Sequence, residues 1–164
     1  MRLPILAAAA AALLIAGCGG GSHNSSNSTS AKSPSGTALV NSAGSGLGDI
    51  VVGPSGRTLY LFKNDTGPTS TCSGACAAQW PPLTTSGAVT SSGNVAMSAL
   101  KTTRRSDGKL QVTLDGHPLY YYSGDTAPGM TNGQGLNTYG ATWWALSPSG
   151  KEITVGGSGS QAGY

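Results

Sequence analysis

Charged residues are scarce in this sequence. Asp, Glu, Lys and Arg make up 9% of the 164 residues, as 9 basic and 6 acidic side chains. The two signs are interspersed, and Arg104-Arg105 is the only adjacent basic pair. A nucleic-acid-binding protein would instead gather its basic residues on one face. The composition therefore argues against a nucleic-acid partner and suits an exported β-protein with many turns.

Side chains that carry chemistry are equally few. The chain has 2 His, and only His117 lies outside the Ser- and Gly-rich segment near the N-terminus. No Gly-x-Ser-x-Gly motif is present, and the glycine-rich runs at 44–48 and 133–135 precede no helix with a phosphate-binding pattern. We therefore predict that the protein is not an enzyme and has no catalytic residue and no cofactor.

The sequence also lacks an apolar run long enough to span a membrane. The run from Leu3 to Ala16 falls short of the roughly 20 residues of a spanning helix but suits the core of a signal peptide. It ends in Ile15-Ala16-Gly17-Cys18, which resembles the lipobox of bacterial lipoproteins, where the cysteine carries a diacylglycerol. We predict a signal peptide over residues 1–17 and a lipid on Cys18 that holds the protein on the extracytoplasmic face of the cell membrane. An ordinary secretory signal with an incidental cysteine is the alternative.

The segments on either side of the central region are rich in Gly and Ser. Residues 18–36 consist almost entirely of Gly, Ser, Asn and Thr, which bury too little apolar area to offset the entropy of the chain. We expect residues 18–36 to form a flexible tether and residues 157–164 to form a flexible tail. The remaining residues, 37–156, have a length typical of one domain.

The clearest secondary-structure signal is a β-hairpin at residues 109–122. Its first arm alternates between apolar and polar side chains, and Asp115-Gly116 is typical of a two-residue turn because both positions tolerate positive φ. A two-residue loop places Leu114 opposite His117.

The same register determines which side chains share a face of the hairpin. It places Leu110 opposite Tyr121 and puts Tyr120 and Tyr122 together on the other face. This tyrosine face is either covered by a second layer or exposed as an aromatic stripe.

Other segments indicate further short strands. Hairpins are expected at 50–62 and 143–155, which turn at Gly-Pro-Ser-Gly and Ser-Pro-Ser-Gly, and a strand is expected at 101–105. Short helical turns are expected at 95–100 and up to Gln79, the latter with Ser73 as a candidate cap. Closely spaced strands with little helical pattern predict an all-β fold.

Two stretches of the chain repeat one pattern. Residues 56–66 read GRTLYLFKNDT, and residues 116–126 read GHPLYYYSGDT. A tryptophan segment follows each stretch, and we align Trp80 with Trp144 by allowing four extra residues in the second copy. We predict two related units, at about 48–87 and about 108–150, that stack on each other to bury their apolar faces.

The repeated residues resemble the motif of a known family. Bacterial lipoproteins described as a secreted repeat of unknown function share a Tyr-x-aromatic-x-x-Asp motif, and the chain resembles them over roughly residues 48–150. The resemblance implies a lipid-anchored, exported, repeat-built protein, and it transfers no catalytic or binding residue. The matching motif residues are Tyr60, Phe62 and Asp65 in the first copy and Tyr120, Tyr122 and Asp125 in the second.

Cys72 and Cys76 remain as an even pair once Cys18 is assigned to the lipid. Outside the cytoplasm such a pair is expected to be oxidised, so we predict a local disulfide. The alternative is a copper or redox site, because thiolates are soft ligands suited to Cu(I). His117 and Met130 are the further ligands that could complete it.

Asp65 and Asp125 each precede a loop. We predict that their carboxylates accept hydrogen bonds from backbone N–H groups of these loops, as Asp does in turns. The alternative is a carboxylate pair for acid–base chemistry or a hard cation. A Ca²⁺ site needs about six oxygen ligands or more, and these loops are otherwise poor in acids.

Aromatic packing must rely on Tyr and Trp, because the chain has 6 Tyr, 3 Trp and 1 Phe. Most of these rings are expected in the core. An exposed stripe would instead suit stacking on sugar rings, and its candidate ligand-binding residues are Trp80, Trp143 and Trp144.

Together these features predict a lipid-anchored protein of the cell envelope with a non-catalytic binding or scaffolding role. The expected partners are the membrane, through the N-terminal lipid, and cell-wall glycan or another envelope protein. Copper or redox handling through Cys72 and Cys76, and glycan binding by exposed aromatic rings, are the alternatives.

Overall fold

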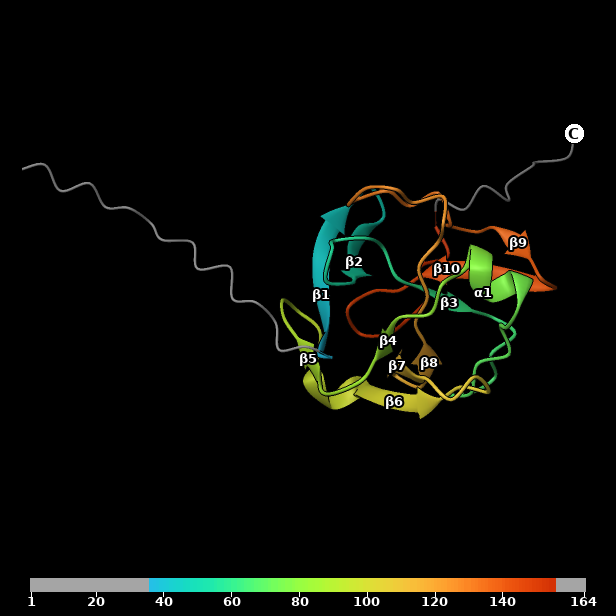
Figure 1. Ribbon diagram of the computed structural model, residues 1–164. Coiled ribbons are helices and arrows are strands. Elements are labelled where there is room, and N and C mark those ends of the chain that lie inside the picture. Colours follow the sequence, from blue (N-terminus) through green and yellow to red (C-terminus); the bar gives the residue numbers. More distant parts are fainter. Residues whose placement is uncertain (1–35, 156–164) are drawn as a thin grey trace, which may run out of the picture. The chain divides into compact units, whose positions relative to one another are not determined.

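The computed structural model describes residues 36–155, which form an all-β structure of short strands, as predicted (Figure 1). The predicted signal peptide over 1–17, Cys18, the tether before residue 36 and the tail over 157–164 lie outside these residues. Within the described part of the chain, no helix is long and apolar enough to cross a membrane. In chain order the elements are β1 (Ala38–Ser45), β2 (Gly48–Val52), β3 (Tyr60–Phe62), α1 (Ala75–Gln79), β4 (Thr84–Thr85), β5 (Val89–Ser91), the 3₁₀ turn η1 (Met97–Ala99), β6 (Leu100–Arg104), β7 (Leu110–Leu114), β8 (His117–Pro118), β9 (Asn137–Thr138) and β10 (Ala141–Ala145).

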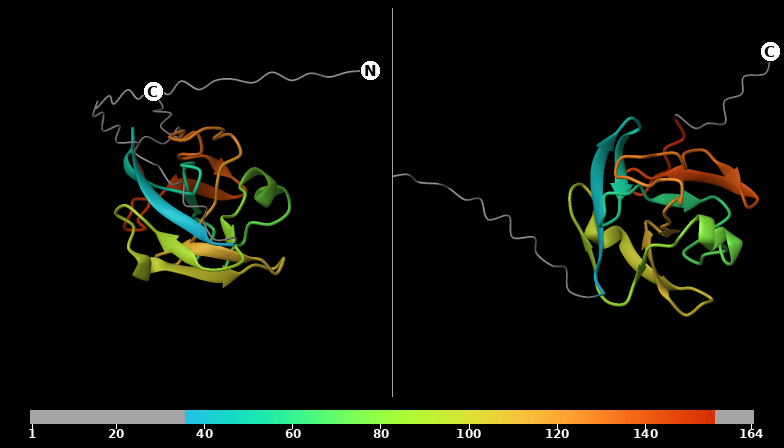
Figure 2. Two further views of the ribbon diagram at one scale, coloured as in Figure 1. Left: turned by 60° about the vertical axis from the view of Figure 1, so that its left-hand side comes forward. Right: turned by 45° about the horizontal axis from the view of Figure 1, so that its top comes forward.

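The strands form three small sheets. Their strand orders are β2-β1-β5, β3-β10-β9 and β4-β7-β6, with β8 paired to β7. The pairs are antiparallel apart from β1 with β5, which is parallel. The views in Figures 1 and 2 agree that β10 lies on the side of this domain away from β6. Because β3 pairs with β10 and β4 pairs with β7, two of the three sheets combine strands from both halves of the chain.

The β1–β2 hairpin of the first half corresponds to the β6–β7 hairpin of the second half. Leu59 N donates a hydrogen bond to Val51 O at 2.9 Å, and Leu119 N donates to Val112 O at 3.0 Å. The segment after each hairpin therefore folds back along its second strand in the same way. This equivalence supports two related structural units.

The two units meet at their tyrosines. Tyr60 N donates a hydrogen bond to Tyr120 O at 2.8 Å, and Tyr120 N donates to Tyr60 O at 3.0 Å. Two equivalent residues that exchange both backbone hydrogen bonds lie across an approximate two-fold axis. The repeats are therefore related by a rotation about an axis that passes between these two residues.

Backbone pairing beyond the tyrosines follows the same symmetry. Lys63 N donates to Thr142 O at 3.0 Å, and Ser123 N donates to Gln79 O at 2.9 Å. Because Lys63 and Ser123 both lie three residues after the motif tyrosines, Thr142 and Gln79 occupy equivalent positions. The residues that follow them are then equivalent as well.

This symmetry corrects the alignment of the tryptophans. Trp80 corresponds to Trp143, which follows Thr142, and the alignment of Trp80 with Trp144 is wrong. Trp80 comes 20 residues after Tyr60 and Trp143 comes 23 residues after Tyr120, so the second copy has three extra residues rather than four. The adjacent tryptophans at 143 and 144 left this choice open in the sequence.

The predicted hairpin at residues 109–122 is confirmed at its turn. Asp115 and Gly116 have φ values of 49° and 83°, and Leu114 pairs with His117. Positive φ at both positions is what a type I′ loop requires, which is why this dipeptide identified it.

The expected pairing of Leu110 with Tyr121 is wrong. Leu110 pairs with Thr85 of β4 on one side and with Arg104 of β6 on the other. Tyr121 N instead donates to Pro81 O at 2.8 Å. The hairpin arms separate because β4, from the other repeat, takes the place beside β7.

The other predicted turns are largely confirmed. Val52 bridges Thr58 in the first expected hairpin, Leu146 bridges Glu152 in the last, and β6 covers most of the strand expected at 101–105. Helix α1 forms, but its N-cap is Gly74, without a side-chain capping bond, so the role expected for Ser73 is wrong. Strands β1, β4, β5 and β9 were not predicted.

The core has two clusters of buried side chains. One is aliphatic and includes Val112, Leu114 and Leu119, and the other is largely aromatic. Both faces of β7 are buried, because its polar residues Gln111 and Thr113 are 0% and 2% exposed. The tyrosine face of the hairpin is therefore covered by a second layer.

Candidate functional site

The motif tyrosines and aspartates form hydrogen bonds between the repeats. Tyr60 Oη donates to Asp125 Oδ2 at 2.5 Å, and Tyr120 Oη donates to Asp65 Oδ2 at 2.6 Å. Both tyrosines and Asp125 are 0% exposed, and Asp65 is 5% exposed. Each repeat thus supplies the donor for the carboxylate of the other. The motif is a reciprocal clasp, which we define by these four residues.

The second oxygen of each carboxylate organises the loop that follows it. Asp65 Oδ1 accepts hydrogen bonds from Thr71 N and Thr71 Oγ1, both at 2.7 Å. Asp125 Oδ1 accepts one from Asn132 N at 2.9 Å. The prediction that both aspartates bind backbone N–H groups of their loops is confirmed.

Burial also sets the protonation state of the clasp phenols. Desolvation raises the pKa of Tyr60 and of Tyr120 well above the ordinary value of 10.0, and the hydrogen bond to the partner carboxylate raises it further. Both phenols therefore stay protonated at neutral pH and act as hydrogen-bond donors. They are neither bases nor nucleophiles in this setting.

Two tryptophans stack at the centre of the aromatic cluster. The ring centroids of Trp80 and Trp143 lie 3.9 Å apart, with an interplanar angle of 3°. Tyr60 meets Trp80 edge-on at 5.5 Å, and Tyr120 meets Trp143 edge-on at 5.2 Å. These paired contacts obey the same two-fold relation as the backbone.

The aromatic residue two positions after each motif tyrosine completes the stack. Phe62 lies parallel to Trp143 at 4.0 Å, and Tyr122 is tilted against Trp80 at 4.5 Å. Aromatic pairs of this kind contribute about 0.5–1.5 kcal/mol each beyond the area that they bury. All six residues thus hold the two repeats together.

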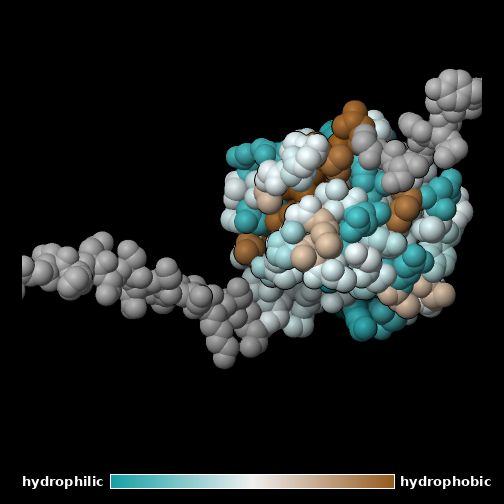
Figure 3. Space-filling model, turned by 90° about the horizontal axis from the view of Figure 1, so that it is seen from above, coloured by the Kyte–Doolittle hydropathy of each residue, from teal (hydrophilic) through white to brown (hydrophobic). Residues whose placement is uncertain are grey.

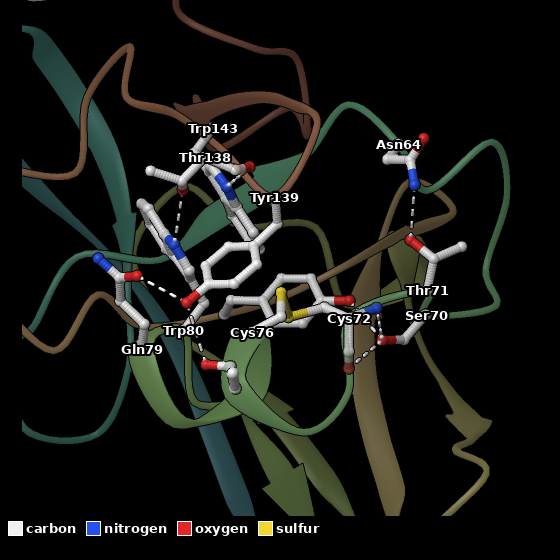
Figure 4. Close-up of a disulfide and its surroundings, with 12 residues drawn as sticks. Asn64, Ser70, Thr71, Cys72, Cys76, Gln79, Trp80, Thr138, Tyr139 and Trp143 are labelled. Carbon is white, nitrogen blue, oxygen red and sulfur yellow. Dashed lines mark hydrogen bonds between the residues drawn. A yellow bond between two sulfur atoms is a disulfide. The ribbon is translucent and has the colours of Figure 1, made fainter.

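This packing decides which aromatic residues face solvent. Trp80 and Trp143 are 0% exposed, so the suggestion that they bind sugar at the surface is wrong. Trp144 is half-buried against the aliphatic cluster. Tyr139 is exposed, and its hydroxyl donates to Gln79 Oε1 at 2.9 Å (Figure 4). The described rings therefore offer no continuous exposed stripe.

The predicted disulfide between Cys72 and Cys76 is confirmed, with the two Cα atoms 5.3 Å apart. Both cysteines are buried, and Cys76 lies in α1. In Figure 4 the disulfide has Trp80 on one side and Ser70 and Thr71 on the other. The disulfide closes the loop that brings Trp80 into the aromatic stack.

A buried arginine fastens this loop to the β6–β7 hairpin. The Arg105 side chain is 4% exposed, and its Nη2 donates to Cys72 O at 2.7 Å. Its Nη1 donates to Ser70 Oγ at 2.8 Å and to Gln111 Oε1 at 2.6 Å. Its Nε has no hydrogen-bond partner among the described residues and lies 3.6 Å from Asp107 Oδ2.

Arg57 plays a similar part for the other loop. Its Nε donates to Asp125 O and its Nη2 donates to Tyr122 O, both at 2.7 Å. Neither arginine was predicted from the sequence to have a structural role. The only available signals were the pair at 104 and 105 and the alignment of Arg57 with His117 in the two repeat copies, and neither indicates a carbonyl partner.

The structure does not assemble the alternative metal site. The two sulfurs are bonded to each other and so are not thiolate ligands. Across residues 36–155, no three His, Cys, Asp or Glu side chains are grouped so that they could hold a metal ion. His117 pairs with Leu114 at the hairpin turn, and Met130 accepts a hydrogen bond from Thr58 through its carbonyl oxygen.

Two grooves on the described surface lie beside the β6–β7 hairpin, one near the 104–110 turn and one near residues 98–103 and 113–116. The larger has a volume of about 550 Å³ and is lined in part by Arg104 and Lys109. The smaller has a volume of about 370 Å³ and is lined in part by Lys101 and Asp115. Lys101 and Arg104 of β6 therefore line different grooves.

Basic residues are concentrated on this hairpin. Four of the seven Lys and Arg in residues 36–155 lie between 101 and 109, and Asp107 is the only acid among them. Three of the four, Lys101, Arg104 and Lys109, are exposed. The charge pattern that looked dispersed along the chain is therefore partly gathered on one element of the fold.

Large apolar side chains are rare on the described surface. The exposed ones are Met97, Met130, Tyr139 and Val155. Figure 3 shows hydrophobic residues on one face as a limited strip among neutral and hydrophilic residues. The grooves beside the β6–β7 hairpin are thus the best-defined candidate binding sites.

Comparison with known proteins agrees with the two-fold architecture. A family model described as a secreted repeat of unknown function matches residues 43–84 and again residues 101–147, which together make up more than half of the chain. No curated protein and no solved structure matches. Each matched segment spans the greater part of one hairpin, one motif and one tryptophan segment. The chain therefore belongs to the family of secreted repeats of unknown function.

Proposed function

We propose that this protein is a lipid-anchored component of the cell envelope with a non-catalytic binding or scaffolding role. The observation that carries the proposal is that the side chains best suited to catalysis are bonded to one another. The clasp phenols bond to the clasp carboxylates, and the two cysteines bond to each other. These groups are buried and have no access to a substrate. A protein whose polar motif holds its own repeats together acts through its surface.

The β6–β7 hairpin is the surface that we assign to this role. β6 is an edge strand of its sheet, and two grooves lie beside the hairpin. Its exposed cations favour an anionic partner at the membrane or in the wall. No specific observation favours copper handling or glycan binding as a second function.

The anchor is tested by supplying cells with an alkyne-labelled fatty acid. The full chain should take up the label at Cys18, and Cys18→Ser should remove it. An unlabelled chain recovered from the culture fluid would contradict the anchored part of the proposal.

The binding surface is tested by photo-crosslinking of the full chain in cells. A photoreactive residue in place of Thr102, exposed on β6, should give adducts with envelope components. The matched control replaces Ser149, exposed in the turn after β10. Equal adducts from both positions, or none from Thr102, would show that the hairpin is not the binding surface.

A further inference from the structure

The larger groove lies where the described chain begins. Gly36 and Thr37 line it together with residues 84–86 and with Arg104 and Lys109 of the β6–β7 hairpin. Thr85 Oγ1 and Ser86 N both bond to Gly36 O, which holds these walls together. No acidic residue is among the described residues that line the groove. Its chemistry is that of hydroxyls, backbone and two positive charges.

Several hydrogen-bond donors in this groove have no partner among residues 36–155. The hydroxyls of Thr37, Thr84 and Ser86 make no hydrogen bond to any residue within 36–155. Arg104 uses Nη1 to bind Gly108 O at 2.8 Å, which leaves its Nε and Nη2 for another acceptor. Lys109 Nζ is 4.0 Å from Asp107 Oδ2, and the Lys109 side chain is 69% exposed. The groove is therefore rich in donors and poor in acceptors.

This combination suits a phosphate group. A guanidinium presents a planar fork to phosphate oxygens, a lysine adds a point charge, and hydroxyls can donate to the remaining oxygens. A sugar ring is less well matched, because the groove lacks the aromatic face and the carboxylate that would bind sugar hydroxyls. The charge and the donors together indicate an anionic ligand that contains phosphate.

The position of the groove along the chain indicates the source of that phosphate. Cys18 lies 18 positions before Gly36, a span of at most about 65 Å even when fully extended. A lipid on Cys18 keeps the groove within this distance of the bilayer. We propose that the groove binds the phosphodiester headgroup of an anionic phospholipid in the membrane that carries the anchor. The proposal rests on the lipid anchor of the proposed function.

The test is calorimetric titration of the full chain, purified in a nonionic detergent, with dihexanoylphosphatidylglycerol. We expect saturable binding that weakens as salt is raised, and little binding of dihexanoylphosphatidylcholine. The double variant Arg104→Gln/Lys109→Gln should bind the anionic lipid about 30-fold more weakly, as expected for two membrane-proximal cations.

The matched control is Lys63→Gln/Lys151→Gln, which removes the same charge from two exposed lysines outside the groove lining. It should bind the anionic lipid like the wild type. An equal loss in both double variants, or no binding by the wild type, would overturn the groove assignment. Binding of inorganic phosphate or of soluble polyglycerol phosphate as tightly as the lipid would overturn the lipid as its source. The fatty-acid label on Cys18 reports separately on the anchor, so failure of the groove and failure of the anchor are distinguishable.

Discussion

Each clasp carboxylate accepts hydrogen bonds from two parts of the structure. The Asp125 carboxylate binds the loop after it through one oxygen and the phenol of Tyr60 through the other. Asp65 does the same for its own loop and for Tyr120. A buried carboxylate that loses its donor keeps the full cost of desolvation. Single-atom changes at the clasp should therefore have large effects.

Removing one clasp hydroxyl tests this idea. Tyr60→Phe leaves Asp125 Oδ2 without its phenol donor and should lower the free energy of unfolding by about 2–3 kcal/mol. The measurement is urea unfolding followed by tryptophan fluorescence. Tyr122→Phe is the matched control, because the Tyr122 hydroxyl makes no hydrogen bond within residues 36–155, and it should change stability by less than about 0.5 kcal/mol. Equal effects of the two variants would show that ring packing, not the hydroxyl, matters.

The raised pKa values of the clasp tyrosines predict how stability depends on alkaline pH. In the unfolded chain both phenols ionise near pH 10, whereas in the folded chain they stay protonated to higher pH. Their contribution is therefore fully present below pH 10 and is lost as pH rises above it. Each should remove about 1.4 kcal/mol of stability per pH unit in that range.

The check is unfolding at a series of pH values above 10, together with absorbance at 295 nm. Phenolate absorbance from Tyr60 and Tyr120 should appear only as the protein unfolds. In Tyr60→Phe/Tyr120→Phe this late absorbance should be smaller, because only Tyr121 keeps a raised pKa through burial, and the loss of stability with pH should be shallower. Ionisation of every tyrosine before any loss of structure would contradict the prediction.

At the scale of elements, loops as well as strands position the aromatic stack: Tyr60 and Phe62 lie in β3 and Trp143 lies in β10, whereas Trp80 follows α1. The loop of the first repeat contains α1 and the disulfide, and Arg105 ties it to the β6–β7 hairpin. The loop of the second repeat brings Gly133 against the rings of Tyr60 and Trp80. Changes in either loop should therefore alter the packing of the core.

Removing the disulfide should weaken the first loop without unfolding the protein. The bond closes a loop of five residues, for which the chain-entropy model gives a stabilisation of about 2 kcal/mol. Cys72→Ala/Cys76→Ala should lower the free energy of unfolding by about this amount and keep the far-UV spectrum. Reducing agent should destabilise the wild type by about as much as the double substitution does, and it should leave the stability of the variant unchanged. A variant that is unfolded without denaturant would show a larger role for the loop.

Gly133 should be intolerant of a side chain. An added Cβ would lie 2.8 Å from Tyr60 Cζ and 3.0 Å from Trp80 Cη2, closer than side chains pack. Gly133→Ala should therefore cost about 1–3 kcal/mol in urea unfolding, the range of overpacked cores. Gly67→Ala is the control in the other loop, because its Cβ would meet nothing within 4 Å. A neutral Gly133→Ala would mean that this loop moves aside easily.

At the scale of the whole molecule, neither repeat is complete by itself. β3 of the first half pairs with β10 of the second, and β4 of the first pairs with β7 of the second. The aromatic stack and the clasp also take half of their residues from each repeat. The domain should accordingly fold as one cooperative unit.

Separate expression of residues 36–95 and 96–155 tests this expectation. Each piece alone should lack a cooperative thermal transition by circular dichroism, because its β-strands and rings lack their partners. The uncut chain should unfold in a single transition, with fluorescence and circular dichroism changing together. A piece that unfolds cooperatively by itself would show that the repeats are independent domains.

Local features of the fold were predictable from the sequence because they depend on neighbouring residues. The Asp115-Gly116 turn, the short strands and the Cys72–Cys76 disulfide each follow from residue types within a few positions. The repeated motif likewise identified the two structural units and the family. Turn chemistry, alternation of polarity and short cysteine spacing all act over this range.

The tertiary structure alone decided how the two units dock. The clasp joins Tyr60 to Asp125 and Tyr120 to Asp65, across 65 and 55 residues of sequence. Pairing each tyrosine with the aspartate of its own repeat would have satisfied the sequence equally well. The burial of Trp143 in place of Trp144 was decided in the same way, because it follows from the two-fold rotation between the repeats. No local propensity encodes that rotation, since it results from packing between segments that are distant in the chain.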